Sequence, residues 1–144
     1  MKLLFSISIS LLLLGCQAQE QHQSGSNGSA QTGIEQNQAN PFANLNADQA
    51  KELIDKGEVV VLDVRTNREF QSGHIEGAEH MDFYGEDFTS KLEDLPKDKR
   101  YLVYCASGNR SGQAVAMMKK MNFEEAHNML GGIGAWSRSY KTVR

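Results

Sequence analysis

The apolar positions from residue 46 onward alternate between a helical spacing and short continuous runs. Residues 47–54 place apolar side chains on one face of a helix, which Asn46 can cap and Gly57 can end. Residues 58–64 form a continuous run rich in Val, which is typical of a strand buried on both faces. The same patterns predict a short helix at 67–73, a loop leading into extended chain at 74–83, a helix or helical turn within 85–95, a strand at 100–105, a helix at 111–123, a strand at 125–132 and a helix at 133–141.

This alternation of strands and helices predicts an α/β fold, with a mainly parallel central sheet flanked by helices on both faces. About 100 residues are enough for a single domain, which we place at 46–144. In open parallel sheets, ligands bind outside the carboxyl ends of the strands. Cys105 stands at the end of a predicted strand, so it is the first candidate for a functional residue.

The first 15 residues have the pattern of a signal peptide. Lys2 precedes an apolar stretch that is shorter than the roughly 20 residues needed to cross a membrane. The stretch ends in Leu-Leu-Gly-Cys, which resembles the lipobox of bacterial lipoproteins. That resemblance implies that Cys16 becomes the lipidated first residue of the mature chain. The alternative is an ordinary signal peptide that is cut elsewhere, with Cys16 removed.

Residues 16–45 are rich in Gln, Asn, Ser, Gly and Ala, and we expect them to form a disordered tether. A lipid on Cys16 would then anchor the domain to a bacterial membrane from the exported, periplasmic side. Gln17 follows the cysteine, which favours the outer membrane in Gram-negative sorting. The net charge of −3 and the 23% of charged residues give no reason to expect nucleic-acid binding. The four histidines lack ligand-like spacing, so no metal site is predicted.

The segment after Cys105 is suited to holding an anion. It reads Ala-Ser-Gly-Asn-Arg-Ser, and it joins a strand to a helix, where backbone N–H groups can turn inward and the helix N-terminus adds partial positive charge. A thiol at this position should ionise easily. Arg110 adds a planar cation suited to a sulfur or phosphorus oxyanion. The predicted anion cup consists of Ala106, Ser107, Gly108, Asn109, Arg110 and Ser111.

The spacing distinguishes two chemistries for this cup. Four residues separate Cys105 from Arg110, whereas cysteine phosphatases have a gap one residue longer. A smaller cup suits a single sulfur atom better than a phosphate. Attack on sulfur, giving a cysteine persulfide, is therefore the leading interpretation, and phosphatase or arsenate reductase activity is the alternative from the same cup.

Four segments in order resemble the rhodanese family. They are the strand-Asp-x-Arg segment at 59–70, the Gly-His-Ile-x-Gly-Ala signature at 73–83, the active loop at 105–111 and the Gly-Gly-x-x-x-Trp segment at 130–136. The likeness covers about residues 46–144 and implies a single-domain, rhodanese-like sulfurtransferase. It implies that the Cys105 thiolate takes the outer sulfur of thiosulfate or a similar donor and passes it to a thiol or cyanide. The implied mechanism requires no metal or organic cofactor.

Asp63 and Arg65 also follow a buried strand, so we expect them near the same edge of the sheet as Cys105. The resemblance implies that Asp63 supports the loop, whereas Arg65 is expected either to contact the substrate or to form an ion pair. The resemblance also implies that Arg110 orients the donor oxyanion and holds the loop. A module of another class, which binds a partner or carries sulfur without turnover, remains an alternative function for the same fold.

Overall fold

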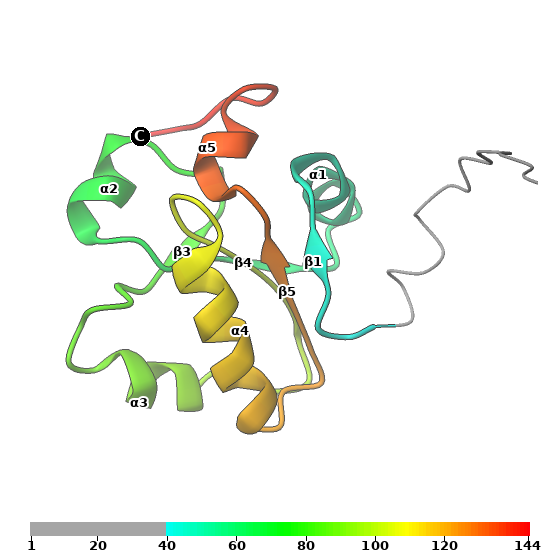
Figure 1. Cartoon of the computed structure of the whole chain (residues 1–144), viewed down its shortest axis with the longest axis vertical. Helices are drawn as coiled ribbons and strands as arrows, with labels where there is room; N and C mark the ends of the chain where they lie inside the picture. Colours follow the sequence, from blue (N-terminus) through cyan, green and yellow to red (C-terminus); the bar gives the residue numbers. More distant parts are fainter. Residues whose placement is uncertain (1–39) are drawn as a thin grey trace, which may run out of the picture. The chain divides into compact units, whose positions relative to one another are not determined.

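The computed structural model describes residues 40–144, and within them the chain forms a five-stranded sheet whose neighbouring strands all run parallel. The strand order is β1-β5-β4-β2-β3, so the strand that precedes Cys105 lies at the centre (Figure 1). The strands are β1 Asn44–Leu45, β2 Val60–Asp63, β3 Glu79–His80, β4 Arg100–Tyr104 and β5 Glu125–Met129. The helices are α1 Ala47–Asp55, α2 Asn67–Ser72, α3 Phe88–Glu93, α4 Asn109–Lys120 and α5 Gly132–Trp136.

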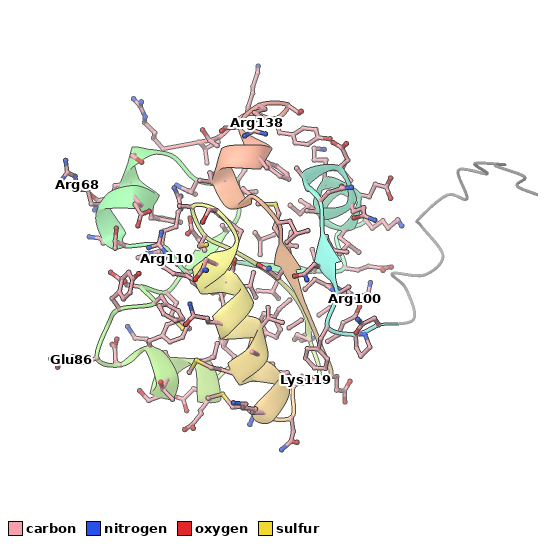
Figure 2. All side chains as sticks on the ribbon, in the orientation of Figure 1. Arg68, Glu86, Arg100, Arg110, Lys119 and Arg138 are labelled. Atoms are coloured by element: carbon pink, nitrogen blue, oxygen red, sulfur yellow. The ribbon has the colours of Figure 1, made fainter. Side chains whose placement is uncertain are left out.

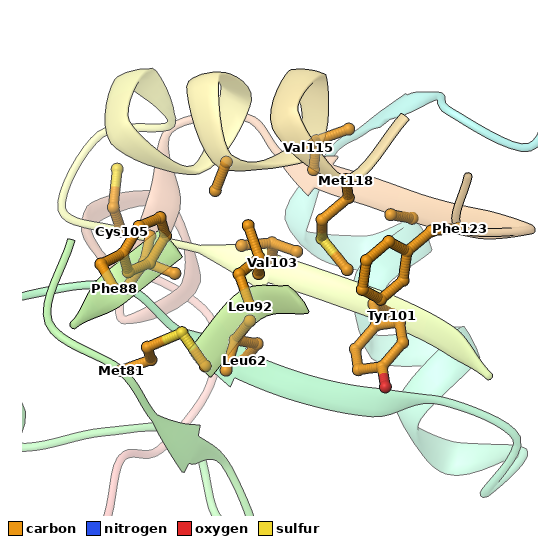
Figure 3. Packing of buried hydrophobic residues seen from close by; sticks show 13 residues of the cluster. Leu62, Met81, Phe88, Leu92, Tyr101, Val103, Cys105, Val115, Met118 and Phe123 are labelled. Atoms are coloured by element: carbon orange, nitrogen blue, oxygen red, sulfur yellow. The ribbon is translucent and has the colours of Figure 1, made fainter. Parts of the chain in front are cut away.

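Successive residues of the central strands face opposite sides of the sheet, and each side has its own core. Leu62 and Val103 pack in a cluster with residues of α3 and α4, which Figure 3 shows with Cys105 at one end and Phe123 at the other. Val61 and Leu102 pack in a second cluster with residues of α1 and α5. Each of these buried aliphatic side chains contributes roughly 1.5–3 kcal/mol through removal from water. The predicted sheet, with helices on both faces, is confirmed.

Two helices begin with the capping signal that their sequences contain. The Asn46 side chain accepts a hydrogen bond from the backbone of Gln49, and the Gln49 side chain accepts one from the backbone of Asn46. Thr66 and Glu69 form the same reciprocal arrangement at the beginning of α2. Each capping box satisfies backbone N–H groups that have no partner within the helix. The capping box of α2 therefore fixes the carboxylate of Glu69 in place.

The folded domain begins before residue 46, where the sequence pattern places the boundary. Residues 40–45 fall in the predicted tether, but Leu45 is buried and β1 pairs in parallel with β5. A strand of two residues is too short to produce a recognisable alternation, which is why the pattern does not reveal it. The predicted signal peptide, Cys16 and most of the tether lie outside the described residues. Within residues 40–144, no helix is long and apolar enough to cross a membrane.

Three helices begin or end at other residues than the sequence pattern predicts. The helix α4 begins at Asn109, two residues before the predicted position, because Gly108 takes a left-handed conformation with φ of 97° and turns the chain into it. The helix α3 occupies only the middle of the predicted segment 85–95. The helix α5 ends at Trp136, whereas the pattern predicts a helix to residue 141. The buried position of Trp136 and its indole N–H bond to the carbonyl of Lys141 hold the chain after that end.

Candidate active site

Cys105 directly follows β4, and its side chain is surrounded by the loop that leads into α4. Its sulfur accepts a hydrogen bond from the backbone N–H of Gly108 at 3.1 Å and lies 3.5 Å from the hydroxyl of Ser111. The residue is only 1% exposed, so its sulfur is almost entirely shielded from solvent. Among the described residues, it is the one free cysteine.

The loop favours the ionised form of this thiol. Burial by itself raises the pKa of Cys105. The hydroxyl of Ser111 and the backbone amides of Ser111, Ser107 and Gly108 act in the opposite direction and together lower the pKa below its ordinary value. Hydrogen-bond donors that face a sulfur stabilise negative charge on it, and the thiolate is the nucleophilic form. The cup is therefore built to generate a thiolate within a shielded position.

Glycine at position 108 is required by the shape of the loop. Its positive φ is uncommon for residues with a side chain, and a Cβ there would lie 3.1 Å from the carbonyl oxygen of Met129 and 3.2 Å from the backbone nitrogen of Gly131. The loop is thus pressed against the segment that follows β5. In this conformation the N–H of Gly108 donates to the sulfur of Cys105.

The segment after β5 supports the loop from its other side. The backbone N–H of Ile133 donates to the carbonyl of Cys105 at 2.8 Å, and that of Gly134 donates to the carbonyl of Ala106 at 3.3 Å. Gly132, with φ of 52°, makes this approach possible, because a Cβ there would overlap the carbonyl of Cys105. The segment 132–134 therefore forms a backbone clamp on the active loop.

Arg110 is held by Glu69 of α2. Its Nη1 donates to Oε2 at 2.9 Å and its Nη2 to Oε1 at 2.7 Å, and Figure 2 shows Arg110 on the α2 side of the beginning of α4. Hydrogen bonds from Arg110, above all, lower the pKa of Glu69 to about 2, and those from Thr66 add to the effect. The same bonds to Glu69 raise the pKa of Arg110. The guanidinium also lies 5.6 Å from the centre of the Tyr84 ring, which is exposed.

Arg65 forms a buried ion pair rather than a rim contact. It is 4% exposed, and its Nη2 donates to Asp63 at 2.6 Å and to the carbonyl of Gly73 at 2.8 Å. Burial alone lowers the pKa of Arg65, but the bonds to Asp63 outweigh it and raise the pKa overall. Of the two predicted roles, the structure favours the ion pair, because the guanidinium has no free access to a substrate. The described side-chain bonds of Asp63 go to Arg65 and not to the loop.

The remaining residues of the predicted cup lie together in the loop. Ser107 and Asn109 are exposed, and Ala106 is half-buried. The side chain of Asn109 accepts a hydrogen bond from Gln113 in the next turn of α4. Ser111 is fully buried, and its hydroxyl donates to the side chain of Asn128 at 2.7 Å.

Two residues of the site have no part in the sequence prediction. Glu69 is recognisable from sequence only as the last residue of a Thr-x-x-Glu capping signal, which points to a helix beginning and not to Arg110. Asn128 is a polar residue within a buried strand, which is the one local sign that it has a partner. Within residues 40–144, no group of three or more potential metal ligands is present.

Comparison with known proteins adds an independent line of evidence. A family model for the rhodanese-like domain matches residues 46–139. The thiosulfate sulfurtransferase GlpE of Pseudomonas putida is 34% identical over 99 residues, which cover 69% of this chain and 88% of that protein. GlpE of Pseudoalteromonas translucida is 29% identical over 99 residues, which cover 69% of this chain and 92% of that protein.

Solved structures agree with this similarity. A rhodanese-related protein from Thermoplasma volcanium is 31% identical with a TM-score of 0.62, and the match covers 70% of this chain and 97% of that one. A rhodanese-like domain protein from Staphylococcus aureus is 27% identical with a TM-score of 0.59, over 65% of this chain and 90% of that one. The predicted fold type is confirmed by these neighbours.

Proposed function

Because this chain belongs to the rhodanese-like domain family, we propose that it is a sulfurtransferase that carries sulfane sulfur as a persulfide on Cys105. The observation that carries the proposal is the surroundings of the Cys105 sulfur, where the amide of Gly108 and the hydroxyl of Ser111 converge and the pKa of the thiol is lowered. The relatives named thiosulfate sulfurtransferase support the same activity.

In the first step, the Cys105 thiolate attacks the outer sulfur of thiosulfate or a similar donor. A new S–S bond forms to Cys105, and the original S–S bond of the donor breaks. Sulfite leaves with the electron pair of that bond. Negative charge then rests on the outer sulfur of the persulfide, where the inward-facing amides of the loop from Ala106 to Ser111 can stabilise it.

In the second step, a nucleophilic acceptor such as a thiolate or cyanide attacks the outer sulfur of the persulfide. The bond between the two sulfurs breaks, and Cys105 leaves as a thiolate. A thiol with a lowered pKa is a good leaving group, so the same loop serves both halves of the reaction. The cycle needs no net oxidant or reductant, because the acceptor takes up the sulfur atom that the donor supplies.

Arg110 supports this chemistry in two ways. Its bidentate pair with Glu69 fixes the first turn of α4, which supplies the hydroxyl of Ser111. The negative charge of a Cys105 thiolate also contributes to the raised pKa of Arg110, so the two groups are within electrostatic reach of each other. We propose that an approaching donor oxyanion contacts the part of Arg110 that Glu69 leaves open.

We further propose that the enzyme works on the exported side of a bacterial membrane. The support is the Leu-Leu-Gly-Cys sequence at the end of the apolar stretch, which would make Cys16 the lipidated residue. Expression in a bacterium followed by mass analysis of the N-terminal peptide tests this. A lipidated Cys16 supports the anchor, and an unmodified or differently cleaved chain overturns it.

The activity itself is tested by thiocyanate production from thiosulfate and cyanide with the full chain. We expect turnover in the native protein and none in Cys105→Ser with unchanged circular dichroism. Equal turnover in both proteins would overturn the assignment. Hydrolysis of an aryl phosphate ester that depends on Cys105, in the absence of sulfur transfer, would favour the phosphatase alternative.

A further inference from the structure

The hydroxyl of Ser111 lies between two acceptors but carries a single proton. Its oxygen is 2.7 Å from Oδ1 of Asn128 and 3.5 Å from the sulfur of Cys105. An uncharged thiol is a weak acceptor, whereas an amide oxygen at 2.7 Å is a good one. With Cys105 uncharged, the proton therefore points to Asn128. A thiolate is a charged and much stronger acceptor, and it draws the proton toward the sulfur.

Asn128 is held in position for this role by its neighbours. Its Nδ2 donates to Oδ1 of Asn44 at 2.9 Å, and the two residues are partners in the β1–β5 register. With Nδ2 of Asn128 turned toward Asn44, the oxygen of the same amide faces Ser111. The side chain is accommodated by Gly112, where a Cβ would lie only 3.3 Å from Nδ2. Glycine is a poor choice for a helix on propensity alone, so the close approach explains its presence in α4.

We propose that Asn128 is a positioning residue that holds the hydroxyl proton of Ser111 whenever the sulfur of Cys105 is uncharged and releases it when that sulfur becomes a thiolate. No proton leaves Ser111 in this exchange, because only the direction of its hydrogen bond changes. The release has a cost, since Oδ1 of Asn128 is buried and loses its donor. Asn128 therefore moderates the stabilisation that Ser111 gives to the thiolate.

The consequence for catalysis rests on the proposed function. When the persulfide forms, charge moves from the inner sulfur to the outer one, and the Ser111 proton returns to Asn128. The loop amides can then donate hydrogen bonds to the outer sulfur. When the acceptor attacks, the inner sulfur regains its charge, and the proton swings back. A thiolate that Ser111 stabilises less strongly is also more nucleophilic, because thiolate nucleophilicity declines as the pKa of the thiol falls.

Other charged groups near Cys105 remain unchanged when Asn128 is substituted. From α4, Arg110 is within electrostatic reach of Cys105, and from α2, Glu69 forms an ion pair with Arg110. The exposed Tyr84 lies against Arg110, and the segment of α5 presents backbone amides to the carbonyls of Cys105 and Ala106. A change in the titration of Cys105 after substitution at Asn128 therefore reports on Ser111.

The test is a double-mutant cycle that measures the pH midpoint of Cys105 alkylation by iodoacetamide. The full chain is used, and modification is followed by mass on the peptide that contains Cys105. The proteins are the native chain, Asn128→Leu, Ser111→Ala and the double variant. We expect Asn128→Leu to lower the midpoint by about half a unit to one unit, because Ser111 then donates to the sulfur without competition. In the Ser111→Ala background, the same change should have no effect.

Two further variants keep the test decisive. If Asn128→Leu does not fold, Asn128→Asp can be used instead, because it keeps the size of the side chain and the acceptor for Ser111. This change should raise the pH midpoint of alkylation more in the native background than in the Ser111→Ala background. His127→Gln changes the neighbouring buried residue of β5, whose ring bonds to Ala43 and Glu125 instead, and should leave the midpoint unchanged. Equal shifts with and without Ser111, or no shift at all, would overturn the proposal. Because alkylation needs no sulfur donor, this result does not depend on whether the chain transfers sulfur.

Discussion

Glu69 and Arg110 are 41 residues apart in the sequence, yet they form a bidentate ion pair with N–O distances of 2.9 and 2.7 Å. Glu69 belongs to the helix that follows β2, and Arg110 belongs to the helix that follows Cys105. The amide and hydroxyl of Thr66 bind the same carboxylate. The position of the active loop therefore depends on a helix that contains no nucleophile.

The first prediction concerns this ion pair. Glu69→Gln keeps the shape of the side chain but removes the charge and one of the two parallel bonds to Arg110. We expect kcat/KM for sulfur transfer to fall roughly tenfold, since bonds to charged groups are worth about 1.5–3 kcal/mol. Steady-state kinetics measure it, with Glu76→Gln at an exposed loop position as the matched control. An increase in rate would mean that Glu69 competes with the donor for Arg110.

The second prediction is a pH dependence of stability. Since Arg110 and Thr66 lower the pKa of Glu69 from 4.5 to about 2, the folded state binds the proton more weakly than the unfolded chain. Glu69 therefore adds stability that is fully present above pH 4.5 and is lost as the pH falls toward 2. Urea unfolding of the native chain and Glu69→Gln should differ most at neutral pH and converge across this window. If the difference instead stayed constant from about pH 6 down to about pH 2, ionisation of Glu69 would not be its source.

The third prediction compares two glycines with positive φ. Gly77→Ala places a Cβ in open space, so it bears only the backbone strain of about 1 kcal/mol. Gly132→Ala bears the same strain and also forces a Cβ against the carbonyls of Cys105 and Ala106. We expect a clearly larger loss of unfolding free energy at Gly132 and a loss of sulfur transfer that Gly77→Ala does not show. Similar losses of activity in both variants would argue against the backbone clamp.

The fourth prediction concerns the pair of Asp63 and Arg65. Both side chains are almost fully buried, so Asp63→Asn leaves an uncompensated charge and should cost about 3–5 kcal/mol of unfolding free energy. The surface pair of Lys51 and Asp55 is the control, and Lys51→Met should cost about 0.5 kcal/mol or less. Denaturant titration measures both. If Arg65→Lys instead raised KM for the donor without loss of stability, Arg65 would be a substrate contact after all.

The fold could be predicted from local patterns because each central strand is buried on both faces. The run at 58–64 and the run at 100–105 therefore lack polar alternation and stand out from the helices around them. The four-residue gap between Cys105 and Arg110 is equally local, which is why the candidate nucleophile and its cup could be identified from sequence.

The rest of the site depends on contacts that no local pattern encodes. Glu69 meets Arg110 and Asn128 meets Ser111 only because β2, β4 and β5 are neighbours in the sheet. The strand β1 has only two residues and lies in a polar stretch of the sequence. Only its pairing with β5 identifies it as a strand. Arg65 shows the same limit, since its sequence position is compatible with both a substrate contact and an ion pair.

The central claim is that Cys105 carries a transferable sulfur, and intact mass spectrometry tests it most directly. The full chain and Cys105→Ser are measured before and after incubation with thiosulfate, and again after addition of cyanide or a thiol. The account predicts that the native protein gains the mass of one sulfur atom, that the acceptor removes it, and that Cys105→Ser gains none. A folded, reduced native protein that gains no sulfur, or a gain that persists in Cys105→Ser, would contradict the account.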